Sequence, residues 1–161
     1  MKHFTKLFIS LVLACTLLLC GCSLIAEKEK TFTKEELSIT LTNRFYESEQ
    51  EGFDLVLAST KAAMFALREE FSEGLGSSET LDQYAQAVID ANELENVETQ
   101  TKDGLTYFVY RSDVDGDEYT YYAFLYKADS AFWLIQFACE SKKADGQTDN
   151  FFKYAKSVSF Q

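Results

Sequence analysis

Histidine is almost absent from this 161-residue chain, whose only copy is His3. Catalytic triads, Cys-His pairs and most zinc sites need an imidazole, because it titrates near neutral pH and its nitrogens bind metals. If the first residues are removed during export, the working protein has no histidine. Carboxylate pairs remain, but Glu69 and Glu70 show nothing beyond adjacency in a chain with 26 acidic residues. We therefore predict that the protein is not an enzyme and needs no cofactor.

Cysteine is scarce in the part of the chain expected to fold. Cys15 and Cys20 lie in the N-terminal segment expected to be removed, and Cys22 is expected to carry a lipid, which leaves Cys139. One thiol cannot form an intramolecular disulfide. Cys139 ends the apolar run 131–139, where a thiol usually acts as a small buried hydrophobe. We expect it in the core rather than as a nucleophile, because no histidine is left to lower its pKa.

Basic residues are outnumbered, with 15 Lys and Arg against 26 Asp and Glu and a formal charge of −11. Removing residues 1–21 takes away Lys2 and Lys6 but no acid, which changes the formal charge to −13. Nucleic acid and an anionic lipid surface would both be repelled by such a chain. We expect no nucleic-acid partner, and we attribute most of the acidity to solubility.

The N-terminus has the order of an export signal. Lys2 and Lys6 precede the apolar run 7–19, which is followed by the small residue Gly21. As a helix at ~1.5 Å per residue, this run would span about 20 Å, short of a ~30 Å hydrocarbon core. A cleaved signal over residues 1–21 is therefore favoured over a permanent membrane span.

Residues 19–23 resemble the lipobox of bacterial lipoproteins, with Leu19 three positions and Gly21 one position before Cys22. The resemblance implies cleavage between Gly21 and Cys22 and a diacylglycerol on the Cys22 thiol. Cys20 fits less well, since Leu19 would then occupy the position next to the cleavage site. Two acyl chains give stable anchoring, so we expect a cell-membrane protein held by the Cys22 lipid on the extracytoplasmic face. The alternative is an ordinary secretory signal with an incidental cysteine.

The remaining residues suffice for one domain. We predict a short tether over 22–30, reaching ~25 to 30 Å when extended, and a single α+β domain over 31–161. Proline is absent, and no internal repeat or low-complexity segment is present. Period-two patterns predict strands at 38–41, 53–58 and 62–69, of which the last two form a hairpin.

A helix is predicted over 81–93, because Thr80 and Gln83 have capping-box spacing ahead of an amphipathic pattern. Short turns containing Asp, Gly or Ser then connect four strand candidates, which together predict an antiparallel meander: 97–101, 105–112, 118–128 and 131–140. A helix starting near Thr148 and a short strand over 157–160 close the chain.

Two features of the predicted meander can each be interpreted in two ways. Asp113, Asp115 and Asp117 are weak candidates for calcium ligands, but Asp115-Gly116 is a strong hairpin-turn signal and the glycine and glutamate spacing of an EF-hand is missing. We favour a solvated turn. The strand 118–128 places aromatic residues on both of its faces, which indicates a sheet covered on both sides. The alternative is an aromatic cleft that accepts a peptide or glycan.

The order of elements resembles the PsbP-like α/β/α sandwich, an antiparallel sheet flanked by helices on its faces. The stretches 80–91, 104–110 and 131–139 carry the likeness. A nuclear-transport-like cone would need its long helices before the meander. The resemblance implies a non-catalytic binding or assembly accessory, and no functional residue of the family can be placed on this chain.

Two functions follow as hypotheses. The first is an anchored accessory module that holds a protein partner at the membrane surface. The second is a lipoprotein that binds a small molecule or peptide in a cleft between helix and sheet. A purely structural role in the envelope is a weaker third.

Replacing Cys22 tests the anchor. We expect the wild-type protein to be membrane-bound with a diacylglycerol adduct, and Cys22→Ser to be neither, because the variant has no thiol to acylate. Intact mass and membrane fractionation of the two proteins measure this. If both are soluble and cleaved, the chain carries an ordinary secretory signal and the lipobox prediction is wrong.

Overall fold

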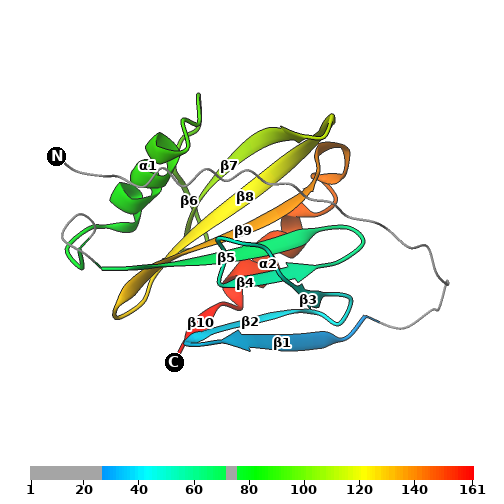
Figure 1. Cartoon of the computed structure of the whole chain (residues 1–161), viewed down its shortest axis with the longest axis horizontal. Coiled ribbons are helices and arrows are strands. Elements are labelled where there is room, and N and C mark those ends of the chain that lie inside the picture. The colour runs from blue at the N-terminus through cyan, green and yellow to red at the C-terminus, as the bar shows by residue number, and fades with distance from the viewer. Residues whose placement is uncertain (1–26, 72–75) are drawn as a thin grey trace.

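The computed structural model describes residues 27–71 and 76–161 and contains two antiparallel sheets, two α-helices and one short 3-10 helix, η1 (Ser141–Lys143) (Figure 1). The fold is α+β, as predicted. The signal, Gly21, Cys22 and most of the tether lie outside the described residues. Within them, no helix has both the length and the apolar character needed to cross a membrane.

The larger sheet has seven strands in the order β3-β4-β5-β9-β8-β7-β6. It contains the predicted hairpin, β4 with β5, and the predicted meander, β6 to β9. Its strands are β3 (Tyr46–Ser48), β4 (Leu55–Ala58), β5 (Ala63–Glu70), β6 (Gln100–Lys102), β7 (Leu105–Val114), β8 (Asp117–Lys127) and β9 (Ala131–Glu140). The sequence did not indicate that β5 would pair with β9, from Ala63 opposite Ala138 to Glu70 opposite Ala131. That pairing joins the hairpin and the meander into one sheet.

Turn residues set the register of the meander. Val114 pairs with Asp117, so Asp115 and Gly116 form a two-residue loop, with φ of 53° and 92°. Both angles are left-handed, as the primed hairpin turns require, and glycine adopts them without a steric cost. β7 consequently continues to Val114, two residues beyond its predicted end.

Helix α1 (Leu81–Ala91) covers part of one face of the large sheet. The predicted capping box is present, since the Thr80 side chain accepts from the Gln83 backbone and the Gln83 side chain accepts from the Thr80 backbone. The helix ends two residues before its predicted end, because Asn92 caps it and Glu93 has a φ of 54°. Tyr84 anchors it by stacking on Phe132, with ring centroids 4.5 Å apart.

The opposite face is covered by helix α2 (Thr148–Lys156) and by a second sheet, in the order β1-β2-β10 (Figure 1). The sequence predicted helices alone. A nine-residue helix is only about 14 Å long, and the small sheet covers the rest. Its strands are β1 (Glu29–Lys34), β2 (Leu37–Thr42) and β10 (Ser159–Phe160). β1 begins inside the segment 22–30 that was expected to be tether.

A polar clamp joins the small sheet to the large one. Trp133 is fully buried, and its indole N–H donates to Glu36 Oε1 at 3.0 Å. Arg68 Nε donates to the same oxygen at 3.2 Å, and its two terminal nitrogens donate to Glu70 and Ser130. The indole hydrogen bond is the main cause that holds the pKa of Glu36 below its usual range, with Arg68 adding to it.

We expect Glu36→Gln to destabilise the protein by about 1 kcal/mol at neutral pH, because the charge-assisted hydrogen bonds weaken. Since the folded-state pKa of Glu36 is lowered, its contribution is present above the unfolded pKa and is lost as the pH falls below about 4. Urea unfolding at several pH values measures this. The control is Glu35→Gln, which removes the same charge from the exposed neighbour. An equal loss in both variants, or a difference that persists in acid, would contradict the clamp.

Candidate functional site

The acidic turn is a hairpin loop on the surface. Asp113 lies opposite Glu118, Asp117 follows the loop, and Arg111 approaches Glu118 to 3.5 Å. Within residues 27–71 and 76–161, no group of three His, Cys, Asp or Glu side chains is placed to hold a metal ion. Asp113, Asp115 and Asp117 therefore share a turn without forming such a group.

Cys139 lies in the core, as predicted, and is 1% exposed. Burial raises the pKa of its thiol to about 11, with the neighbouring Glu140 adding to the shift. At neutral pH the group is a thiol, which is a poor nucleophile.

The carboxyl groups with shifted pKa values do not indicate acid catalysis. The pKa values of Glu36, Asp103 and Glu140 are all lowered, by the Trp133 indole for the first and by lysine partners for the other two. A general acid at neutral pH needs the opposite shift. The large upward pKa shifts belong to Cys139 and to four tyrosines, and burial is their main cause.

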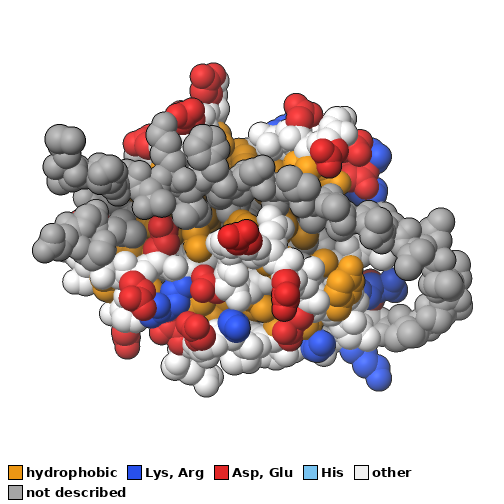
Figure 2. All heavy atoms as spheres, viewed as in Figure 1, with side chains coloured by type: hydrophobic (Ala, Val, Ile, Leu, Met, Phe, Trp, Pro, Cys, Tyr) orange, Lys and Arg blue, Asp and Glu red, His pale blue; other side chains and the backbone are white. Residues whose placement is uncertain are grey.

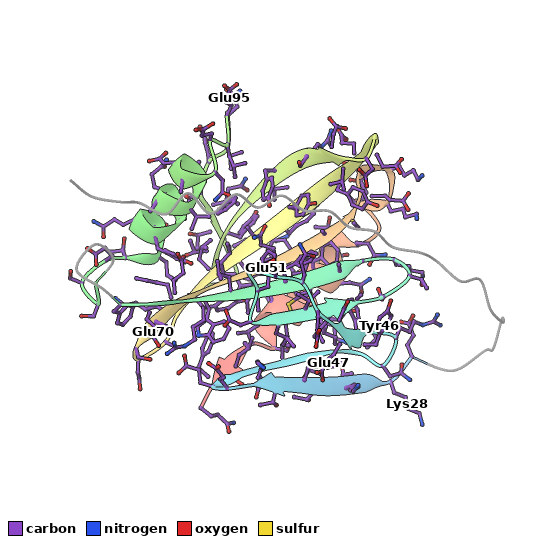
Figure 3. The ribbon with its side chains drawn as sticks, in the orientation of Figure 1. Lys28, Tyr46, Glu47, Glu51, Glu70 and Glu95 are labelled. Atoms are coloured by element: carbon purple, nitrogen blue, oxygen red, sulfur yellow. The ribbon has the colours of Figure 1, made fainter. Side chains whose placement is uncertain are left out.

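A hollow of about 450 Å³ lies beside β3, at the edge of the large sheet. Four of its ten lining residues carry carboxylates, and Lys34 is the one cation among them. Its lining residues are Lys34, Glu47, Ser48, Glu49, Gln50, Glu51, Phe53, Asp54, Leu55 and Val56. Figure 3 shows Glu47 and Tyr46 beside β3, and Glu51 in front of the neighbouring strands. Tyr46 is 57% exposed, an unusual exposure for a large hydrophobic side chain in this chain.

Glu47, Glu49 and Glu51 are unneutralised, since none of them forms an ion pair in the part of the chain that the structure describes. Asp54 differs, because its Oδ2 accepts from the Arg68 backbone N–H at 2.7 Å and so fixes the loop. All three glutamates are exposed. Only Glu47 lies in a strand, and Glu51 lies in a turn, so their spacing of two residues does not by itself place the three side chains on one side.

Next to the hollow lies a tyrosine cluster, which we define as Val56, Ala63, Phe65, Tyr121 and Ala138, with Phe53, Tyr110 and Tyr119 packed against it. It occupies the same face as α1, but no residue of α1 belongs to it. Val56 and Phe53 belong both to the cluster and to the lining of the hollow. The two features therefore meet at Phe53 and Val56, but Phe65 and Tyr121 are buried and do not line the hollow.

Tyr110 and Tyr121 stand opposite each other on β7 and β8 and stack, with centroids 4.7 Å apart and ring planes 9° apart. Tyr110 reaches across β8 and donates to Gln136 Oε1 on β9 at 2.6 Å. The hydroxyl of Tyr121 has no hydrogen-bond partner among the described residues, although the residue is only 3% exposed. Burial raises the pKa of Tyr121 to about 12. A buried polar group without a partner costs free energy.

No protein-family model and no curated protein sequence matches the chain. The solution structure of cyanobacterial PsbP (CyanoP) from Synechocystis sp. PCC 6803 is similar, with a TM-score of 0.52 and 16% identity over 90% of this chain and 99% of that chain. The fold is PsbP-like. At this identity the likeness shows the fold alone, and it transfers no functional residue.

Two further solved structures are similar. A Bacteroides thetaiotaomicron protein gives a TM-score of 0.60 at 11% identity over 82% of this chain, and the match spans 48% of that protein. LpqN, described as involved in cell envelope biogenesis of Mycobacterium tuberculosis, gives a TM-score of 0.47 at 9% identity, over 85% of this chain and 92% of that one.

Replacing either stacked tyrosine by phenylalanine is expected to change the free energy of unfolding, but by different amounts. Tyr110→Phe removes the donor to buried Gln136, so we expect a loss of about 1 to 2 kcal/mol in the free energy of unfolding. Tyr121→Phe removes a hydroxyl with no partner, so we expect no loss, or a gain of up to about 1 kcal/mol. Urea unfolding of both variants beside wild type measures this. Equal losses would mean that the Tyr121 hydroxyl is hydrogen-bonded in solution.

Proposed function

We propose that this protein is a non-catalytic accessory module, held on the extracytoplasmic face of the membrane by the lipid on Cys22, that binds a protein partner. The observation that carries the proposal is the unneutralised acidic hollow at an edge of the large sheet, where it meets the tyrosine cluster. Tyr46, which is exposed, precedes Glu47 on β3, and an exposed aromatic side chain beside uncompensated charge is typical of recognition surfaces. The PsbP-like fold supports a binding or assembly role by analogy.

Binding of a small molecule between helix and sheet is less well supported. The space beneath α1 is filled by Tyr84, Ala85 and Ile89, which are at most 3% exposed. The Tyr84 hydroxyl also donates to Glu69 at 2.5 Å, which holds the helix on β5. The hollow lies at the β3 edge, away from this helix. The geometry therefore favours the partner-binding function.

Site-specific photo-crosslinking tests the proposal in intact cells. A photoreactive residue in place of Tyr46, at the edge of the hollow, is expected to give a discrete adduct with one partner. The same residue in place of Glu95, which Figure 3 shows beyond α1 and far from Tyr46, is the matched control. Combining the Tyr46 probe with Cys22→Ser is expected to reduce the adduct, because the protein leaves the membrane. Absence of an adduct at position 46, or the same adduct at both positions, would contradict the proposal.

A further inference from the structure

Strand β1 is the outermost strand of the small sheet and lies along the outside of the molecule (Figure 1). It has six residues, five of them exposed, whereas the other outermost strands are short: β3 and β6 have three residues each and β10 has two. Short edge strands limit pairing with other chains. β7 extends past β6 as well, but that stretch leads into the acidic turn. β1 is therefore the outermost strand with room for a further strand along most of its length.

The hydrogen bond between Lys28 and Asn43 shows which backbone groups of β1 face β2. The Asn43 N–H donates to the Lys28 carbonyl at 2.7 Å. These two residues adjoin the first register pair, Glu29 with Thr42. In an antiparallel ladder, hydrogen-bonded pairs alternate with pairs that are not hydrogen-bonded. The even-numbered residues of β1 therefore bond to β2, and the odd-numbered residues point their N–H and C=O groups outward.

Ser157 confirms this assignment from the other side of β2. The Thr40 N–H donates to Ser157 Oγ at 2.9 Å, and the Thr40 carbonyl oxygen lies 3.1 Å from the same Oγ, so both groups point away from β1. Thr40 is the register partner of Thr31, whose backbone groups consequently point outward too. The backbone groups of Glu29, Thr31 and Thr33 have no hydrogen-bond partner among the described residues. β1 thus presents a row of free donors and acceptors that repeats about every 7 Å.

Lysines make this edge basic on an acidic protein. Lys30 and Lys34 lie on the same side of β1 as buried Phe32, and Lys30 Nζ lies 4.2 Å from the centroid of that ring. Neither lysine forms an ion pair within residues 27–71 and 76–161, although Lys34 also lines the acidic hollow, whereas Glu29 is paired with Lys153 at 2.9 Å. Figure 2 shows acidic side chains over much of the view and basic ones at its lower right margin. Charge complementarity favours a strand that carries carboxylates opposite the two lysines.

Two copies of β1 do not suit each other. Outward-facing residues have to stand opposite one another, so the numbers of paired residues sum to an even number. Of the two registers that pair most of the strand, one places Lys30 opposite Lys34 of the second copy, and the other places Lys28 opposite it. Like charges directly opposite destabilise a sheet, and both copies carry a net negative charge. The lysines therefore oppose self-pairing at the edge where they favour an acidic strand.

We propose that β1 is a docking edge for an extended segment of a partner protein, which adds to the small sheet as a further strand. Backbone hydrogen bonds to the outward groups of β1 hold the segment, as in other cases of strand addition. On the Phe32 side, the segment carries an apolar residue between two acidic residues, which bind Lys30 and Lys34. This edge belongs to the small sheet, whereas Tyr46 lies on β3 of the large sheet. The inference therefore goes beyond the proposed function.

Fluorescence polarisation with a labelled peptide, Thr-Glu-Thr-Val-Thr-Glu-Thr, tests the proposal with the mature chain in detergent. The peptide has the same pattern in both chain directions, so it covers parallel and antiparallel addition. Peptide and protein are both negative, so net charge opposes binding and a local basic surface has to overcome it. We expect wild type to bind this peptide and not to bind a matched peptide with glutamine in place of glutamate. Absence of binding to the glutamate peptide would overturn the proposal.

Replacing Lys30 and Lys34 together by Gln is expected to weaken binding at least about tenfold. The matched control replaces Lys61 and Lys102 together by Gln, which removes the same charge from exposed positions on the large sheet. Circular dichroism verifies that both variants are folded. An equal loss in the two variants would overturn the proposal, because binding would then depend on net charge alone.

Amide hydrogen exchange, measured by NMR, tests whether the peptide adds as a strand. In the free protein we expect slow exchange at Lys30 and Phe32, which bond to β2, and fast exchange at Thr31 and Thr33. Bound peptide is expected to slow exchange at the two threonines. Thr31→Pro removes an outward N–H and no bond to β2, so we expect it to fold and to bind at least several-fold more weakly. Unchanged exchange at Thr31 and Thr33 in the peptide complex would overturn strand addition, whether or not Thr31→Pro folds.

A second copy at this edge has its own signature. Slow exchange at Thr31 and Thr33 without peptide, together with a dimer in sedimentation velocity that Thr31→Pro dissociates, would overturn the acidic partner and place another copy on β1. The proposed function is tested separately, at Tyr46. A Tyr46 adduct without peptide binding leaves the accessory function standing and overturns the docking edge, whereas peptide binding without an adduct does the reverse.

Discussion

The structure depends on burying both faces of strand β9. Nine of its ten residues are buried, with Glu140 as the exception. Trp133, Ile135 and Phe137 face the small sheet and α2, whereas Phe132 and Leu134 face α1. A strand that is apolar on both sides has to lie inside its sheet and under two layers. The pairing of β9 with both β5 and β8 meets the first condition, and the helices with the small sheet meet the second.

Coverage of the second face explains the clamp around Glu36. The Trp133 ring is apolar enough to lie in the core, but its N–H needs an acceptor when it is buried. Glu36 comes from the turn between β1 and β2, and its backbone carbonyl also accepts from the Gln161 N–H at 3.0 Å. The small sheet and the C-terminus are therefore fixed at the position where the large sheet has a buried donor. Hydrogen bonding sets where this second layer sits, and apolar burial stabilises it.

Local signals in the sequence predicted most elements. The Thr80 capping box, the Asp115-Gly116 turn and the alternation along β8 each depend on residues close in sequence, and the structure contains all three. Non-local pairings were not predicted, because the pairing of Ala63 with Ala138, or of Ser38 with Ser159, leaves no local pattern. The hollow was missed for the same reason. The spacing of Glu47, Glu49 and Glu51 is visible, but the approach of Lys34 and Val56 depends on the folded chain.

Protection of the sheet edge accounts for part of the acidity beside β3 but not for all of it. Short, charged edge strands prevent pairing with other chains, and β3 is a three-residue edge strand that carries Glu47. Glu49 and Glu51 lie beyond the end of that strand, where no ladder needs protection. The Asp54 carboxylate fixes their loop by accepting from the Arg68 N–H. An edge blocked only against aggregation would not need a loop that holds further unneutralised carboxylates next to Phe53 and Val56. The charge of Glu49 and Glu51 therefore lies outside what protection of the edge requires.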